Sequence, residues 1–212
     1  MVEAIIFDMD GVLFDTEKYY YDRRANFLAQ KGISIDHLPP SFFIGGNTKQ
    51  VWENILRDDY DNWDVPTLQE EYNAYKQDNP LPYKELIFPD VFKVLNEVNS
   101  RGLKIGLASS SVKADILRAL EENRLQGFFD IVLSGEEFKE SKPNPEIYLT
   151  ALQHLNVEAN QALIIEDSEK GIAAGVAAGV EVWAIKDNRF GMDQGAAKGL
   201  LDNLMDVLDL LK

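Results

Sequence analysis

The chain has 212 residues and no cysteine, and 36 acidic side chains against 21 basic ones give it a formal net charge of −15 at pH 7. The absence of cysteine excludes disulfides, thiolate nucleophiles and cysteine-ligated zinc or iron–sulfur sites. The negative charge argues against nucleic acid and anionic membranes as partners. The length allows one sizeable domain or a domain with a smaller insert, and the 45% of hydrophobic residues is enough for a core.

The first predicted element is a strand at residues 4–7. Its short, continuous apolar run, Ala-Ile-Ile-Phe, is typical of a strand buried on both faces of a parallel sheet. The residues before it contain no basic segment followed by an apolar stretch, so we expect no signal peptide. We expect a cytoplasmic protein that acts as a monomer.

Residues 16–82 interrupt the strand pattern and are predicted to be helical only. Apolar residues recur at helical spacing in three segments, which are marked by Tyr21, Ala25 and Leu28, by Val51, Trp52, Ile55 and Leu56, and by Leu68, Tyr72 and Tyr75. Residues 79–82, Asn-Pro-Leu-Pro, are typical of a hinge that leads back to the main domain. We interpret this stretch as a helical insert.

Further apolar runs at residues 104–108, 131–133, 162–165 and 181–185 alternate with helical patterns. Val91, Val94, Leu95 and Val98 fit one helix face, Asn144 and Pro145 resemble the start of another helix, and Ser168 is a candidate N-cap for a third. This alternation predicts an α/β fold with a doubly wound parallel sheet of the Rossmann-like kind. Ligands bind such sheets beyond the carboxyl ends of the strands.

Asp8 and Asp10 lie directly after the first predicted strand, and Gly11 follows them. Two carboxylates this close need a cation or a proton between them. One could attack phosphorus while the other handles the proton of the leaving oxygen. A turn with exposed acids is the alternative interpretation of these residues.

Three other polar segments follow strands. The serines at 109–111 open a predicted helix, where hydroxyls and free N–H groups can bind an anion or simply cap the helix. Lys142, held extended by Pro143, could reach a phosphate or could be an ordinary surface lysine. Glu166 and Asp167 suit Mg²⁺, although acids at a helix start also complement the helix dipole.

With these four segments in order, the chain resembles the haloacid dehalogenase superfamily. The resemblance is to its branch of phosphatases and β-phosphoglucomutase-like enzymes with a helical cap after the first strand. The residues that carry it are 8–17 (Asp-Met-Asp-Gly-Val-Leu-Phe-Asp-Thr-Glu), 109–111 (Ser-Ser-Ser), 142–148 (Lys-Pro-Asn-Pro-Glu-Ile-Tyr) and 165–168 (Ile-Glu-Asp-Ser) with Gly171 and Ile172. The resemblance covers essentially the whole chain. It implies a core domain of residues 1–15 and 83–212 and a cap domain of residues 16–82.

The resemblance also implies roles for the site residues. Asp8 is the expected nucleophile, and Asp10 is the expected general acid and then base. The expected phosphate-binding residues are Ser109, Ser110 and Lys142, and the expected ligands of the Mg²⁺ cofactor are Asp8, Asp10 through its backbone carbonyl, Asp167, and Glu166 directly or through water. The expected partner is a small phosphorylated metabolite, with no nucleic acid and no membrane.

Two departures from the resemblance bear on the reaction. A mutase of this branch carries a histidine at the position of Tyr20 and Lys-Asn at the position of Val112 and Lys113. We therefore predict a phosphatase that hydrolyses an aspartyl-phosphate on Asp8, with a phosphomutase as the alternative. A third hypothesis is a receiver or binding module whose Asp8 is phosphorylated without turnover.

The insert is expected to select the substrate. Candidate contacts are Thr16, Tyr20, Asn47 and Lys49. The Gly45-Gly46 pair lacks the spacing of a P-loop, and a loop before a helix capped at Asn47 or Thr48 is the plainer interpretation of that segment.

Overall fold

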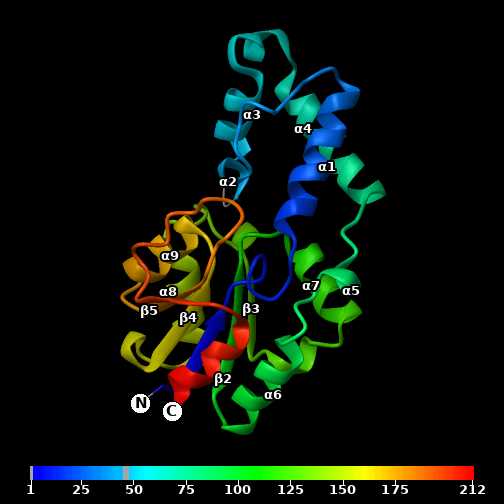
Figure 1. Ribbon diagram of the computed structural model, residues 1–212. Coiled ribbons are helices and arrows are strands. Elements are labelled where there is room, and N and C mark those ends of the chain that lie inside the picture. Colours follow the sequence, from blue (N-terminus) through cyan, green and yellow to red (C-terminus); the bar gives the residue numbers. More distant parts are fainter. Residues whose placement is uncertain (1, 45–47) are drawn as a thin grey trace. The chain divides into compact units, whose positions relative to one another are not determined.

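The core of the protein is a six-stranded parallel sheet, shown in the computed structural model of Figure 1, which describes residues 2–44 and 48–212. Its strands are β1 (Ala4–Phe7), β2 (Lys104–Ser109), β3 (Ile131–Ser134), β4 (Ala162–Glu166), β5 (Glu181–Ile185) and β6 (Gly199–Leu201). They lie in the order β3-β2-β1-β4-β5-β6, and every neighbouring pair is parallel. The predicted α/β fold with a doubly wound parallel sheet is therefore confirmed, and β6 is a strand that the sequence pattern did not predict.

The chain reverses its direction of strand addition at β1. From β1 it adds β2 and then β3 on one side, and it then crosses to the other side for β4, β5 and β6. Such a reversal leaves a crevice beyond the carboxyl end of the central strand, because the connections on its two sides diverge. Asp8 is the first residue after β1, so the fold places it at this point.

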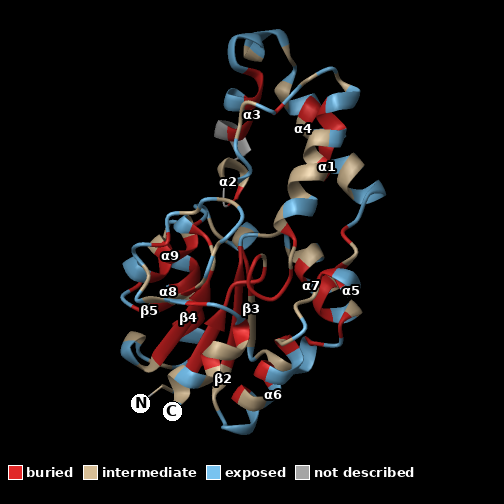
Figure 2. Ribbon diagram, viewed as in Figure 1, coloured by how far each residue is buried: buried red, intermediate tan, exposed pale blue. Residues whose placement is uncertain are grey.

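Helices cover both faces of the sheet. On one face, α8 (Glu146–Leu155) packs on β1, β2 and β3, and α9 (Glu169–Ala177) packs on β4 and β5. On the other, α6 (Val91–Ser100) packs on β2 and α7 (Lys113–Glu122) on β3. The 3₁₀ segment η5 (Leu204–Leu211) packs on α6, and shorter turns lie at α5 (Tyr83–Leu86), η2 (Gln126–Phe128), η3 (Gly135–Glu137) and η4 (Ala159–Gln161). In Figure 2 the strands are buried, whereas the helices each have one exposed side.

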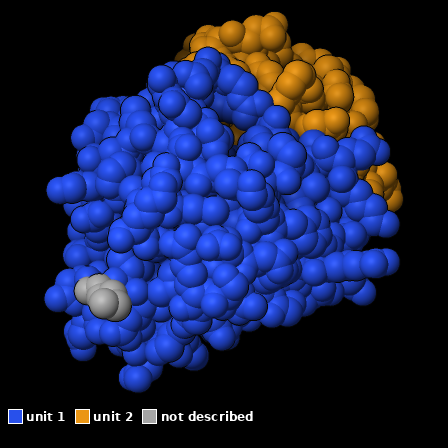
Figure 3. Space-filling view, turned by 60° about the horizontal axis from the view of Figure 1, so that its bottom comes forward, with its two compact units in different colours: residues 1–15, 83–212 blue, residues 16–82 orange. Residues whose placement is uncertain are grey.

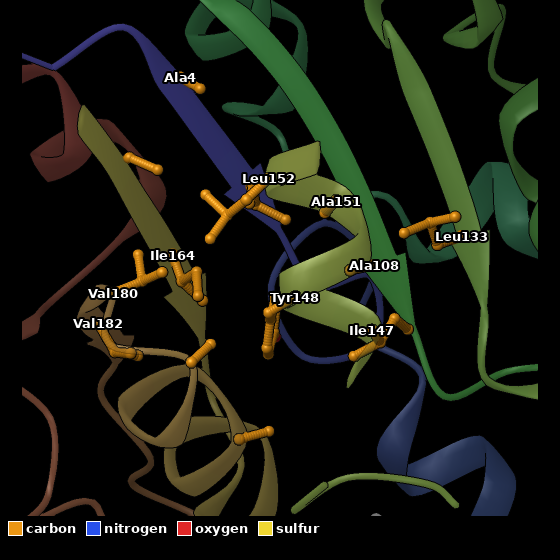
Figure 4. Close-up of a cluster of buried hydrophobic side chains, with 14 of the residues drawn as sticks. Ala4, Ala108, Leu133, Ile147, Tyr148, Ala151, Leu152, Ile164, Val180 and Val182 are labelled. Carbon is orange, nitrogen blue, oxygen red and sulfur yellow. The ribbon is translucent and has the colours of Figure 1, made fainter. Parts of the chain in front are cut away.

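A continuous apolar cluster fills the space between α8, α9 and the sheet. Figure 4 shows Tyr148, Ala151 and Leu152 of α8 beside strand residues such as Ala108 and Ile164. Full burial of a side chain as large as leucine or isoleucine stabilises a fold by about 1.5–3 kcal/mol. Close packing of α9 depends on Gly175, because a Cβ there would lie 2.5 Å from a methyl carbon of Val182.

Two helix starts differ from the sequence-based expectation. α7 begins at Lys113 and not within the serine segment. The hydroxyl of Ser109 accepts a hydrogen bond from the backbone N–H of Ser111 at 3.0 Å, and such local bonds compete with helix formation. α8 begins at Glu146, with Pro145 as its N-cap, although the side chain of Asn144 still accepts from the Glu146 N–H at 2.9 Å. The expected cap at Ser168 is confirmed, since its hydroxyl accepts from the Gly171 N–H at 3.1 Å.

The described residues form two compact units, residues 1–15 with 83–212 and residues 16–82, which Figure 3 distinguishes by colour. The second, the inserted unit, contains α1 (Glu17–Gln30), α2 (Pro40–Phe43), α3 (Thr48–Leu56), η1 (Arg57–Asn62) and α4 (Val65–Asp78). Its own apolar cluster includes Phe27, Leu28, Trp52, Leu68 and Tyr72. α1 and α4 have 14 residues each, and no described helix is long and apolar enough to cross a membrane.

The two ends of the insert leave the core unit side by side. The N–H of Asp15 donates to the carbonyl of Leu86 at 2.7 Å, and the N–H of Phe88 donates to the carbonyl of Leu13 at 3.0 Å. These bonds join the segment after Asp8 to the segment that follows the insert.

Candidate active site

Four polar segments meet at the carboxyl edge of the sheet. Asp8 follows β1, Ser109 ends β2, and Glu166 ends β4. Because β1 pairs with both β2 and β4 in parallel register, residues more than 100 positions apart in the chain become neighbours. Lys142 joins them from the loop between β3 and α8.

A buried lysine links two of the carboxylates. The ammonium of Lys142 donates to Asp8 Oδ1 at 2.6 Å, to Glu166 Oε1 at 2.7 Å and to the carbonyl of Ala108 at 2.9 Å. The Lys142 side chain is only 4% exposed, and those of Asp8 and Glu166 are 9% and 0% exposed. One positive charge is thus shared between two acids that have almost no access to water.

The environment moves the pKa values of these groups in different directions. Burial raises the pKa of Asp8 to about 8, helped by the charges of Glu166 and Asp10 and opposed by Lys142. Burial works against the charge of Lys142, yet the two acids hold the pKa of Lys142 well above its usual range. For Glu166, burial is outweighed by Lys142 and by hydrogen bonds, so the pKa of Glu166 lies below its usual value.

Both oxygens of Glu166 accept hydrogen bonds from the protein. Oε1 accepts from Lys142 and, at 2.6 Å, from the hydroxyl of Tyr148. Oε2 accepts from the Asp167 N–H at 3.1 Å, the Ser168 N–H at 3.3 Å and the Ser168 hydroxyl at 3.2 Å. Burial and the charge of Glu166 raise the pKa of Tyr148, which keeps its phenol a neutral donor. These bonds satisfy Glu166 and fix its orientation.

Asp8, Glu166 and Asp167 form the group of acids suited to a cation. Each offers a carboxylate oxygen, and the three oxygens lie within 4.8 Å of one another among the described residues. An oxygen-only set of this kind fits Mg²⁺, which is bound by one or two carboxylates and keeps several waters. The raised pKa of Asp8 gives such a cation a role, because a divalent cation beside Asp8 would favour the anion that a nucleophile needs.

Gly11 makes room for the Asp167 carboxylate. Its φ is +80°, and a Cβ at this position would lie 1.9 Å from Asp167 Oδ2. Gly171 has a similar role beside Glu166, since a Cβ there would lie 1.8 Å from Oε1. The acidic cluster therefore requires glycine at two positions that approach it from different elements.

Two serines orient Asp10. The hydroxyl of Ser111 donates to Asp10 Oδ2 at 2.6 Å, and that of Ser109 lies 3.5 Å from the same oxygen. Ser134 supports this arrangement, because its hydroxyl donates to the carbonyl of Ser111 at 2.7 Å. Asp10 is thus held by hydroxyl donors, whereas Asp8 is held by a lysine. This difference suits a proton-handling role for Asp10 and a nucleophilic role for Asp8.

The structure brings together most of the residues that the sequence singled out in the core unit. Asp8, Lys142, Glu166 and Asp167 are clustered, and Asp10 contacts Ser109. Ser110 lies at the same edge of the sheet with an exposed side chain. The predicted roles of these residues in phosphate and metal binding stay predictions.

The predicted substrate contacts belong to the inserted unit. Thr16 is buried at the start of α1, and its carbonyl accepts from the Tyr20 N–H at 3.0 Å. The ring of Tyr20 lies 5.4 Å from the guanidinium carbon of Arg23. Lys49 is a residue of α3, and Asn47 lies outside the described residues. Their role in substrate selection stays a prediction.

The sequence did not reveal the contacts that three residues make at the site. These are Ser111, as the close partner of Asp10, Tyr148, as a donor to Glu166, and Gln194, whose amide donates to the carbonyl of Asp167 at 2.6 Å. Tyr148 belongs to the 142–148 segment, but the sequence carries no signal that its hydroxyl reaches Glu166. Gln194 lies in a loop without any recognisable pattern.

The sheet with its reversal at β1, and the buried acids that share one lysine, define a doubly wound α/β protein with an acidic site at the carboxyl edge of its sheet. The model of the family described as haloacid dehalogenase-like hydrolase matches residues 5–185. The chain belongs to this family, and the resemblance inferred from the sequence is confirmed.

Individual relatives agree with the family. The chain is 29% identical over 221 residues to a phosphorylated carbohydrates phosphatase of Thermotoga maritima, with 100% of this chain and 99% of the relative covered. It is 29% identical over 182 residues to a phosphoglycolate phosphatase of Aquifex aeolicus, covering 85% and 83%. Among solved structures, a β-phosphoglucomutase of Clostridium difficile matches with a TM-score of 0.80 and 27% identity, covering 96% of this chain and 92% of that one.

Proposed function

We propose that the protein is a Mg²⁺-dependent phosphatase that hydrolyses a small phosphorylated metabolite through an aspartyl-phosphate on Asp8. The observation that carries this proposal is the cluster of Asp8, Lys142, Glu166 and Asp167 at the carboxyl edge of the sheet, with Asp10 beside it. The family assignment favours turnover over the alternative of a receiver that is phosphorylated without catalysis.

In the first half-reaction, a carboxylate oxygen of Asp8 attacks phosphorus. The bond from phosphorus to the ester oxygen breaks, and Asp10 gives its proton to that oxygen so that an alcohol leaves. The hydroxyl of Ser111, 2.6 Å from Asp10 Oδ2, holds the acid in place for this transfer. The ammonium of Lys142, 2.6 Å from Asp8 Oδ1, offsets the negative charge of the approaching phosphoryl group.

In the second half-reaction, water attacks the phosphorus of the aspartyl-phosphate. Asp10, now a carboxylate, takes a proton from this water, and the bond between phosphorus and Asp8 breaks to release inorganic phosphate. Asp8 and Asp10 return to their starting protonation states. The cycle therefore needs no residue beyond those at the edge of the sheet.

Mg²⁺ would be held by Asp8, Asp167 and the backbone carbonyl of Asp10, and it supplies positive charge that stabilises the transferring phosphoryl group. Glu166 is proposed to act on the metal site through its neighbours or through water, because both of its oxygens already accept bonds from protein donors.

The metal role predicts that activity disappears in EDTA and returns when Mg²⁺ is added in excess. The reason is that the acids at the site leave the phosphoryl group facing a surplus of negative charge when no cation is present. Release of inorganic phosphate from p-nitrophenyl phosphate, measured before and after chelation, checks this prediction. Full activity of exhaustively chelated enzyme would exclude the proposed metal role.

The proposed substrate is a sugar phosphate or a similar short-chain phosphate ester. The names of the relatives support this class, since one is a phosphatase of phosphorylated carbohydrates and another of phosphoglycolate. A helical cap that closes over a site favours small substrates, and we propose that the inserted unit acts as such a cap. Comparison of kcat/KM across phosphorylated sugars, nucleotides and short organic phosphates tests the substrate class.

A phosphomutase is the second candidate, because a solved β-phosphoglucomutase matches the fold. Hydrolysis is favoured by Tyr20, which stands where a mutase carries histidine. Tyrosine is a poor base near pH 7, because the reference pKa of a phenol is about 10, so it is a poor substitute for an imidazole in handling protons. Water then accepts the phosphoryl group.

The choice between these reactions predicts that β-glucose 1-phosphate, if it is turned over, yields inorganic phosphate and not glucose 6-phosphate. The enzyme is incubated with this sugar phosphate, with and without catalytic glucose 1,6-bisphosphate, and both products are followed. Efficient formation of glucose 6-phosphate with little free phosphate would reassign the protein as a mutase. The chemistry on Asp8 would stand in either case, because both reactions share the first half-reaction.

A further inference from the structure

Gln194 connects the candidate metal site to the loop after β5. Its side chain is buried, with 9% of the residue exposed. The amide nitrogen donates to the carbonyl of Asp167 at 2.6 Å and to the carbonyl of Ile185 at 2.7 Å, while the amide oxygen accepts from the Asp187 N–H at 2.9 Å. One side chain therefore joins the ends of β4 and β5 to the start of the loop.

The loop that carries Gln194 is itself fixed. The carboxylate of Asp187 accepts from the N–H groups of Arg189 at 2.8 Å, of Phe190 at 2.9 Å and of Met192 at 2.7 Å. The guanidinium of Arg189 donates to both carboxylate oxygens of Asp15, at 2.7 and 3.0 Å. A loop held in this way can support a site, because Gln194 has little freedom to follow a displaced partner.

The position of Asp167 is not set by a regular element alone. It follows the last residue of β4 and precedes Ser168, the N-cap of α9, so neither element includes it. Its carboxylate fits only because Gly11 lacks a Cβ, with 1.9 Å separating Oδ2 from the position a Cβ would take. A small rotation of the Asp167 peptide would therefore move the carboxylate away from Asp8 and Glu166.

We propose that Gln194 is a positioning residue that holds the Asp167 carboxylate in place for Mg²⁺ by fixing the Asp167 peptide. This inference rests on the proposed metal role of Asp167. Replacing Gln194 by methionine keeps the length of the side chain and removes both donated bonds together with the bond accepted from the Asp187 N–H. The carbonyl of Asp167 then loses the partner that sets the direction of its peptide.

The test compares Gln194→Met with Gln161→Met. Gln161 precedes β4 at the opposite edge of the sheet, where its amide donates to Glu3 at 2.5 Å and accepts from the Glu158 N–H at 2.9 Å. Both substitutions remove hydrogen bonds at one end of β4, but only one end carries the acids. Mg²⁺ binding is measured by isothermal titration calorimetry, and thermal unfolding is measured in EDTA.

We expect Gln194→Met to raise the dissociation constant for Mg²⁺ about tenfold, as outer partners of metal ligands do when removed. Gln161→Met is expected to leave that constant within about twofold, because distant sites act independently. The Mg²⁺ concentration for half-maximal activity should rise in Gln194→Met, and kcat should recover at saturating Mg²⁺. Gln194→Asn, which stays polar but is one methylene shorter, tests the same point if the methionine variant does not fold.

Equal Mg²⁺ affinity in the Gln194 variants and the wild type would overturn the positioning role, even if both variants unfold at lower temperature. An equal loss of affinity in Gln161→Met would also overturn it, because the effect would then be general destabilisation. No Mg²⁺ binding by the wild-type protein would refute the metal role itself, and the role of Gln194 with it.

Discussion

Asp8→Asn is expected to abolish phosphate release while leaving the fold intact. An amide is not a nucleophile toward phosphorus, and removing a nucleophile lowers kcat by about 10⁴-fold or more. The asparagine keeps the shape of Asp8 and still offers an oxygen to Lys142, which also keeps its bond to Glu166 at 2.7 Å. Phosphate release and thermal unfolding, measured on the same preparation, check both parts of the expectation.

Asp130→Asn is the matched control. Its carboxylate accepts from the Ile105 N–H at 2.8 Å, near the amino end of β2 and so at the other edge of the sheet. This variant should keep activity within about twofold, because sites that share no partner act independently. Appreciable turnover by Asp8→Asn free of contaminating phosphatases would contradict the nucleophilic role and reopen the hypothesis of a non-catalytic receiver.

The sequence was informative where chemistry coincides with regular structure. The apolar runs predict the first five strands because residues buried on both faces of a parallel sheet must be continuously apolar. Asp8 and Glu166 follow or end such runs, so the fold class alone places them at one edge. The strand β6 has only three residues, and only one of them is buried, so the sequence contains no comparable apolar run there.

Contacts between side chains and loops were not predictable in the same way. Gln194 reaches Asp167 from a loop whose path is set by hydrogen bonds to Asp187, and such bonds leave no periodic signal. Ser111 was taken as part of a helix start, whereas the local bond between Ser109 and Ser111 delays the helix to Lys113. The pairing of Lys142 with Glu166 likewise became visible only in the fold.

Lys142→Met is expected to destabilise the protein by about 3–5 kcal/mol in EDTA, the typical cost of removing one partner of a buried ion pair. The lysine is the shared partner of Asp8 and Glu166, at 2.6 and 2.7 Å, and its loss leaves both acids buried without it. A methionine fills much of the same volume, so the cost arises mainly from the uncompensated charges. The free energy of unfolding from urea titration measures it.

Lys113→Met provides the comparison, because this lysine bonds one carboxylate and one carbonyl, where Lys142 bonds two carboxylates and one carbonyl. It donates to Glu137 at 2.8 Å and to the carbonyl of Val132 at 2.6 Å, but its side chain is 35% exposed and that of Glu137 is 40% exposed. The pair between exposed groups contributes less than about 1 kcal/mol. Equal losses of stability in the two variants would show that breaking the buried pairs of Lys142 costs no more than breaking the exposed pair of Lys113.

A second substitution separates lost charge compensation from lost packing. In the double variant Lys142→Met, Glu166→Gln, one of the two unpaired acids is made neutral while its shape is kept. If uncompensated charge is the cause, the double variant should be more stable than Lys142→Met alone, so that the two substitutions are not additive. If the packing of the lysine were the cause, the second substitution would add its own cost, because Glu166 accepts bonds from Tyr148 and Ser168 that favour its charged form. A recovery of stability would therefore identify Lys142 as the charge that allows two acids to remain buried at the site.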